Sequence, residues 1–167
     1  MSEGESSSYA RLKAHKSLAE ILKTAVSFER TARDFYTALA PRVGKNIRYL
    51  VEELAAEEQR HFDLFSELMA RPDLEAQVGE LVETPTSDAR FSDCIQLPEL
   101  GENPDDQAVL QYALGREHTA MEQYASLAES APDGPIRELF RYLADEETQH
   151  KNELEKLYYS VVHSGGV

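Results

Sequence analysis

IRYLVEELAAEEQRH at residues 47–61 recurs as IRELFRYLADEETQH at residues 136–150. In both segments apolar residues return every three or four positions, which is the spacing of one face of an α-helix. Both segments end in Glu-x-x-His, formed by Glu58-x-x-His61 and Glu147-x-x-His150. Residues three apart on a helix lie on the same side, so each segment predicts a glutamate and a histidine on its apolar face.

A second pair of similar segments precedes the first pair. FERTARDFYTALA at residues 28–40 matches REHTAMEQYASLA at residues 116–128. The match aligns a glutamate, a tyrosine and several small apolar residues, and it includes Glu29 with Glu117 and Tyr36 with Tyr124. We therefore interpret the chain as a duplicated helical hairpin whose two halves pack with pseudo-twofold symmetry.

Helical periodicity and capping signals predict four long helices. They span about Ser17–Pro41, about Asn46–Ala70, Asn103-Pro104 to about Ser130, and Asp133-Gly-Pro135 to just before Ser164. Ser17 and Glu20 suit a capping box, and Asn103 followed by proline suits an N-cap. Short links within each pair predict two antiparallel hairpins.

The two hairpins are joined by a long segment, Pro72–Pro104, with a short helix expected around Asp73–Leu81. A link of this length can cross the bundle from end to end. We predict an all-α protein with the ferritin-like four-helix bundle layout, two helical hairpins joined by a long crossover. The bundle should form one domain over residues 17–163, with a flexible lead-in at 1–16 and a tail at 164–167.

Charge and composition exclude several classes of protein. The formal net charge of −14 disfavours nucleic acid and anionic membrane surfaces as partners. No apolar run approaches the roughly 20 residues that span a bilayer, and the N-terminus does not resemble a signal peptide. Cys94 is the only cysteine, which excludes an internal disulfide and a four-thiolate metal site, and which fits a reducing cytoplasm.

Six titratable side chains interrupt the apolar stripes of the four helices. Burying carboxylates without compensation costs several kcal/mol for each ion. Two divalent cations would neutralise four glutamates, and two neutral imidazoles would complete the coordination. One glutamate from each of two helices plus Glu-x-x-His from the other two is a described arrangement for dinuclear carboxylate sites. The predicted metal ligands are Glu29, Glu58, His61, Glu117, Glu147 and His150.

The sequence leaves alternatives open at this site. The core histidines can instead hydrogen-bond glutamates without metal, or the bundle can be structural and hold inert zinc. Tyr36 and Tyr124, two turns beyond Glu29 and Glu117, can hydrogen-bond a ligating carboxylate or simply fill the core. Glu57 and Glu146 can hold the distal nitrogen of a histidine, although we favour a solvated face for both.

With these motifs in this order, the chain from about Ser17 to Tyr159 resembles the rubrerythrin branch of the ferritin-like superfamily. The resemblance implies two iron ions, with Glu58 and Glu147 as bridging carboxylates and one histidine on each ion. It implies an oxidoreductase that reduces peroxide or oxygen with oxidation of Fe(II). The same donors also suit manganese and zinc, and a non-catalytic iron-handling protein is the alternative function.

Two departures from typical rubrerythrins bear on the reaction. One cysteine cannot build their rubredoxin domain, so a separate electron donor such as a rubredoxin is implied, unless ferrous iron is itself the substrate. The resemblance also implies a further glutamate where this chain has Ala120, which makes the set of donors more similar to the symmetric site of bacterioferritins. Without a fifth helix to build a storage shell, we expect a homodimer.

Overall fold

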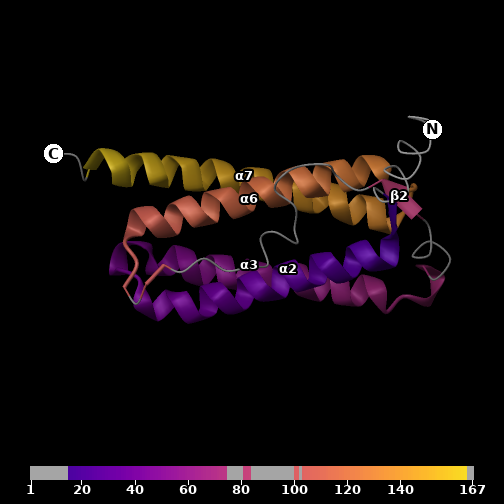
Figure 1. Cartoon of the computed structure of the whole chain (residues 1–167), viewed down its shortest axis with the longest axis horizontal. Coiled ribbons are helices and arrows are strands. Elements are labelled where there is room, and N and C mark those ends of the chain that lie inside the picture. Colours follow the sequence, from indigo (N-terminus) through magenta and orange to yellow (C-terminus); the bar gives the residue numbers. More distant parts are fainter. Residues whose placement is uncertain (1–14, 75–80, 84–99, 102, 165–167) are drawn as a thin grey trace, which may run out of the picture.

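Four long helices form the protein, arranged as two antiparallel hairpins that lie against each other (Figure 1). The computed structural model describes residues 15–74, 81–83, 100–101 and 103–164. The first hairpin consists of α2 (Leu18–Leu39) and α3 (Lys45–Met69), and the second of α6 (Asp106–Ser130) and α7 (Pro135–Ser164). The predicted four-helix bundle is confirmed. None of the described helices is both long enough and apolar enough to cross a membrane.

The connection between the hairpins starts and finishes at opposite ends of the bundle, as predicted. The chain leaves α3 through a short 3-10 turn, η2 (Pro72–Leu74), and enters α6 at the far end (Figure 1). Of the short helix expected around Asp73–Leu81, residues 75–80 lie outside the described residues, as does Cys94. Leu81 does not continue a helix, because it begins a strand.

A small two-stranded ribbon was not predicted. Strand β1 (His15–Ser17) pairs antiparallel with β2 (Leu81–Glu83), with Ser17 opposite Leu81. The ribbon ties the start of α2 to the connection between the hairpins. The described structure begins at His15, two residues before the predicted domain boundary, while residues 1–14 and 165–167 lie outside the described part.

Local signals explain where the helices begin. The Ser17 hydroxyl accepts a hydrogen bond from the Glu20 amide at 3.2 Å, which confirms the predicted cap of α2. The predicted cap of α6 was wrong by two residues. Asp105, rather than Asn103, accepts from the Ala108 amide at 2.7 Å, because a carboxylate at this position adds favourable charge at the helix N-terminus.

The repeat also fixes the turn inside each hairpin. After a 3-10 turn, η1 (Ala40–Arg42), the Arg48 guanidinium donates back to the carbonyl of Ala40 at 3.1 Å. At the matching place in the second half, Arg137 donates to the carbonyl of Ala128 at 2.8 Å. Each arginine thus binds a carbonyl that the end of the preceding helix leaves unpaired. This shared contact is consistent with duplication of one hairpin.

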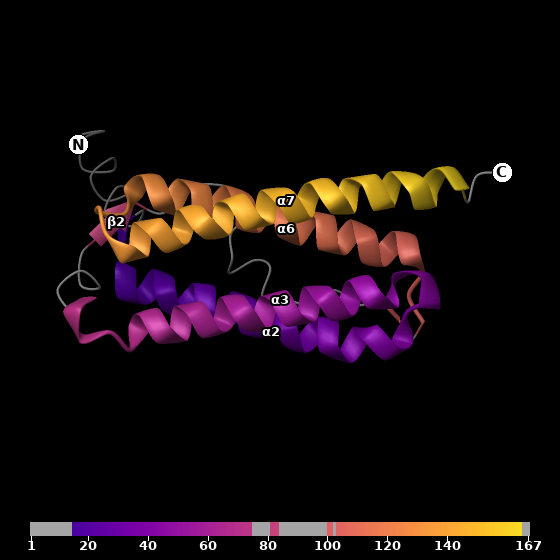
Figure 2. The same cartoon turned by 180° about the vertical axis from the view of Figure 1, so that it is seen from behind.

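The apolar core is divided into two clusters along the bundle axis. One cluster gathers around Phe28, Phe65 and Phe140, near the ribbon end. The other gathers around Tyr36, Val51 and Leu110, toward the opposite end. Between them lies a layer of buried polar side chains. Seen from behind, α7 extends beyond its neighbours at the far end (Figure 2).

Candidate metal centre

The six predicted ligand residues lie together in the polar layer between the two apolar clusters. We call them the six-residue cluster. Five of them are at most 1% exposed, and the His150 side chain is 13% exposed. Each lies near the middle of its helix. Each also points into the bundle, because it lies on the helix face that the apolar core residues occupy above and below this layer. The members are Glu29 on α2, Glu58 and His61 on α3, Glu117 on α6, and Glu147 and His150 on α7.

Both histidines are oriented by a carboxylate from the opposite hairpin. The Nε2 atom of His61 lies 2.7 Å from Glu146 Oε2, and that of His150 lies 2.8 Å from Glu57 Oε2. The solvated-face interpretation that we favoured for these two glutamates was wrong. Each is only about one-fifth exposed, because the histidine it contacts crosses the space between α3 and α7.

Fixing the distal nitrogen leaves the other ring nitrogen, Nδ1, facing the cluster. The Nδ1 atom of His61 lies 3.3 Å from Glu147 Oε1 and 3.5 Å from Glu29 Oε2. The Nδ1 atom of His150 lies 3.8 Å from Glu117 Oε2. A histidine held by a carboxylate through one nitrogen is the usual arrangement when the other nitrogen binds a metal.

Two sets of three ligand atoms converge closely enough to hold an ion. Within each set the ligand atoms lie within 4.8 Å of one another. The first set is Glu29, His61 and Glu147, and the second is Glu117, Glu147 and His150. Glu147 is common to both sets. Glu58 belongs to neither.

Glu58 is held instead by a buried arginine that the sequence analysis missed. Arg116 on α6 is 3% exposed, and its guanidinium donates to both carboxylate oxygens of Glu58, at 2.7 and 2.8 Å. It also donates to Glu29 and Glu117, each at 3.3 Å. The available signal was the repeat itself, in which a cation at position 116 takes the place of Phe28.

Burial and neighbouring charges shift the acid–base behaviour of the carboxylates in opposite directions. Burial raises the pKa of Glu58 well above its usual range; Arg116 opposes this shift and the charge of Glu29 adds to it. Burial would also raise the pKa of Glu29, but its interactions with Glu58, His61 and Arg116 lower it overall. Glu29 is therefore the better candidate for a permanently ionised ligand.

The two histidines are protonated at neutral pH in the metal-free protein. Burial alone would lower the pKa of His61, but the carboxylates of Glu29 and Glu146 raise it to about 9. In the same way Glu117 and Glu57 outweigh burial and raise the pKa of His150 to about 10. Two imidazolium ions thus offset part of the negative charge of the four glutamates, and a metal must displace their inward-facing protons.

The two tyrosines near the cluster differ in their contacts. The Tyr124 hydroxyl donates a hydrogen bond to Glu29 Oε1. Tyr36 is equally buried, but its hydroxyl has no hydrogen-bond partner among the described residues. Burial raises the pKa of both phenols well above its usual range, so both remain neutral donors.

The donor atoms of the cluster fit a metal pair. Among the described residues, six buried side-chain polar atoms lack a hydrogen-bond partner, and all but the Tyr36 hydroxyl belong to the cluster. A buried polar atom left unpaired is costly, and a cation coordinated by these atoms would remove the cost. The five cluster atoms are His61 Nδ1, Glu117 Oε2, both carboxylate oxygens of Glu147, and His150 Nδ1.

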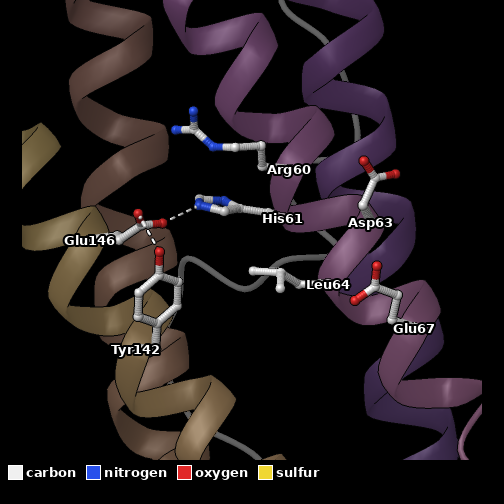
Figure 3. Close-up of a pocket in the computed structure, with 7 residues that line it drawn as sticks. All are labelled: Arg60, His61, Asp63, Leu64, Glu67, Tyr142 and Glu146. Carbon is white, nitrogen blue, oxygen red and sulfur yellow. Dashed lines mark hydrogen bonds and ion pairs between the residues drawn. The ribbon is translucent and has the colours of Figure 1, made fainter.

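A surface pocket of about 260 Å³ reaches the cluster beside His61 (Figure 3). On the α7 side, the Tyr142 hydroxyl donates to Glu146 Oε1 at 2.8 Å, and Glu146 in turn binds His61 (Figure 3). Tyr142 is 50% exposed. Two hydrogen bonds therefore connect a solvent-accessible phenol to a histidine of the cluster.

A family model described as Rubrerythrin matches residues 20–158. No curated protein matches the sequence.

Three solved structures share the fold. A Thermotoga maritima protein described as ferritin-like diiron-carboxylate is 19% identical with a TM-score of 0.67, covering 87% of this chain and 96% of that one. A hypothetical protein from Pyrococcus furiosus is 24% identical with a TM-score of 0.63, covering 88% and 91%. A dodecameric thioferritin, the bacterioferritin-related protein from Bacteroides fragilis, is 20% identical with a TM-score of 0.62, covering 88% and 86%. These similarities confirm the ferritin-like fold.

The contact between Glu146 and His61 predicts a change in metal affinity. Replacing Glu146 with glutamine should weaken divalent metal binding by about 10- to 100-fold, because His61 loses the carboxylate that orients it. Isothermal titration with Zn(II) measures the effect. Glu153→Gln, which alters an exposed carboxylate of the same helix, is the matched control. Equal affinities of both variants would contradict the orienting role.

The raised pKa values of the histidines predict how the metal-free protein responds to pH. A histidine of the unfolded chain titrates near pH 6.5. The two protonated histidines therefore stabilise the folded protein fully below that pH, and this contribution is lost as pH rises through the folded-state pKa values of about 9 for His61 and about 10 for His150. We expect Tm to fall by more than about 5 °C between pH 6.5 and pH 10. His61→Gln/His150→Gln should give a flatter profile in the same thermal melts. Parallel profiles would show that these histidines do not couple folding to pH.

Proposed function

Since the chain belongs to the rubrerythrin family, we propose that it is a non-haem di-iron oxidoreductase that reduces peroxide or oxygen and oxidises Fe(II) at the six-residue cluster. The observation that carries this proposal is the convergence of five buried ligand-type atoms that have no hydrogen-bond partner among the described residues. Such a set is costly in a structural bundle, and it matches the carboxylate and imidazole donors of dinuclear iron proteins.

The proposed ligands divide between two metal positions. Glu29 and His61 would hold an ion at one position, and Glu117 and His150 would hold an ion at the other. Glu147 would contribute to both positions, which is supported by its place in both sets of convergent atoms. Glu58 would be the second carboxylate shared by both positions, and it could take that role only if Arg116 released it, because both of its oxygens accept hydrogen bonds from Arg116.

Iron is the metal that we propose, on the basis of the family. Carboxylates and imidazoles also accept manganese or zinc, and the relative affinities of divalent ions do not favour iron. Bound iron supplies the electrons for reducing the oxidant. The protein's own side chains hold the ligands in place, with Glu146 and Glu57 behind the histidines and Tyr124 behind Glu29.

The surroundings of the cluster suit a reaction that excludes bulk water. Apolar layers close the bundle above and below the cluster, and in a dry site the charges of fixed side chains act more strongly. The pocket beside His61 is the entrance that we propose for a small oxidant. Its volume is ample for hydrogen peroxide or oxygen.

Electrons for repeated turnover must come from another source. The sequence has one cysteine, so it contains no four-cysteine rubredoxin site. We propose a separate donor such as a rubredoxin, or Fe(II) itself as the substrate. We also propose a homodimer in the reducing cytoplasm, where a lone cysteine needs no disulfide partner.

Iron handling without catalytic turnover is the second candidate function. It is favoured by Ala120, a fully buried residue of α6 one turn beyond Glu117. The family resemblance implies a glutamate there that is associated with the peroxidase cycle. A protein without this glutamate would bind two metal ions and release them without processing peroxide repeatedly.

Anaerobic Fe(II) titration followed by rapid mixing with hydrogen peroxide or oxygen tests the proposal. We expect two Fe(II) per chain to bind and both to be oxidised faster than free Fe(II). Because one hydrogen peroxide accepts two electrons, a single peroxide molecule can oxidise both ions. Stopped-flow absorbance follows the reaction, and His61→Gln/His150→Gln is the control without imidazole donors. Oxidation no faster than that of free Fe(II) would remove the oxidoreductase. Binding with a single oxidation event, and no turnover on adding a reductant, would favour iron handling.

A further inference from the structure

The positively charged Arg116 side chain lies within the six-residue cluster, where the proposed metal ions would bind. Its guanidinium lies against three of the four cluster glutamates and binds Glu58 through two hydrogen bonds. Paired contacts of this kind, between the planar guanidinium and both oxygens of one carboxylate, are the strongest and most directional that arginine makes. In the metal-free protein Arg116 therefore compensates part of the carboxylate charge that a bound metal ion would otherwise compensate.

This arginine breaks the symmetry of the repeat. The residue that matches it in the first half is Phe28, and the guanidinium lies 4.1 Å from the centre of that ring. A phenylalanine cannot hold Glu147 as Arg116 holds Glu58. As a result both oxygens of Glu147 lack a hydrogen-bond partner among the described residues, while both oxygens of Glu58 have one.

The asymmetry extends to the two metal positions. At one position Glu117 Oε2, Glu147 and His150 Nδ1 are free of hydrogen bonds within the described structure. At the other position the Glu29 carboxylate is engaged on both sides, by Tyr124 through Oε1 and by Arg116 through Oε2. The two positions share Glu147, and each has a histidine Nδ1 without a hydrogen-bond partner among the described residues. They differ in the third ligand, because Glu117 keeps one oxygen without a hydrogen bond and Glu29 keeps none.

We propose that Arg116 makes the two metal positions unequal: the position of Glu117, Glu147 and His150 takes the first divalent ion, and the second ion binds more weakly because Arg116 must first release Glu29 and Glu58. This inference rests on the proposed function only in requiring that the cluster binds divalent metal. It goes beyond that function by assigning an order of loading and the residue that sets it.

Charge balance supports the same order. Four glutamates balance two divalent ions, so two ions together with Arg116 leave one excess positive charge in a buried layer, which is costly. One divalent ion and Arg116 together bring three positive charges to four carboxylates, so no positive charge is left in excess. The second ion therefore carries the cost of moving a buried guanidinium, and the first does not.

Titration of the metal-free full-length chain with Mn(II) alone tests the proposal. Calorimetry gives the affinity of each step, and electron paramagnetic resonance distinguishes an isolated Mn(II) from a coupled pair. We expect the second step of the wild type to be at least about tenfold weaker than the first. In Arg116→Met we expect the two steps to agree within about threefold, with the coupled signal appearing at lower Mn(II) concentration.

A second readout reports on the metal-free state. Without Arg116 three buried carboxylates lose the guanidinium that they share, so the Tm of metal-free Arg116→Met should fall by more than about 5 °C. Added Mn(II) should restore it. Arg141→Met, at an exposed position on α7, is the control and should match the wild type in both measurements. Arg116→Lys keeps the charge but not the paired contact, and its second step should be intermediate.

The outcomes separate this inference from the proposed function. Two equal steps in the wild type, or a second step that neither Arg116 variant strengthens, would overturn the role of Arg116 and leave the metal centre intact. If metal-free Arg116→Met does not fold, the comparison of Arg116→Lys with the wild type decides the matter. No Mn(II) binding by any variant would overturn the metal centre and the inference together.

Discussion

Four glutamates buried in one layer of a helical bundle impose the constraint on which the rest of the structure depends. Each ionised carboxylate removed from water is costly unless a cation or hydrogen-bond donor compensates it. In the metal-free protein Arg116 and the two protonated histidines provide that compensation. The compensation is least complete at Glu147, whose oxygens accept no hydrogen bond among the described residues. A metal pair would complete it, and the reactivity that we propose follows from that pair.

Duplication of one hairpin accounts for most of the geometry. It places a Glu-x-x-His on α3 and another on α7, and each histidine crosses to a carboxylate that precedes the other motif, through Glu146 and Glu57. The two hairpins are therefore linked through the same contacts that orient the proposed ligands, so folding and site formation are coupled. The symmetry is then broken by Arg116 opposite Phe28 and by Tyr142, which links His61 to the surface through Glu146.

The sequence was sufficient for the helices and for the convergence of the six-residue cluster, because both follow from helical periodicity and from an internal repeat. It was not sufficient where tertiary contacts decide. Arginine is a residue type that usually lies on the surface. Arg116 is buried because it binds three carboxylates, one on its own helix and one on each of two other helices. Glu57 and Glu146 looked solvated for the same reason. The ribbon of β1 and β2 joins segments far apart in the chain, and the pairing of such short segments has no local signal.

The most direct test of the account is anomalous diffraction from crystals of the protein loaded with Mn(II). The account predicts two anomalous peaks inside the bundle, one beside Glu29 and His61 and one beside Glu117 and His150, with Glu147 between them and the Arg116 guanidinium displaced from Glu58. A bundle without an anomalous peak in this layer, with Arg116 still bound to Glu58 at saturating Mn(II), would contradict it. The polar layer would then be a self-compensated ion cluster, and its function would have to be sought elsewhere.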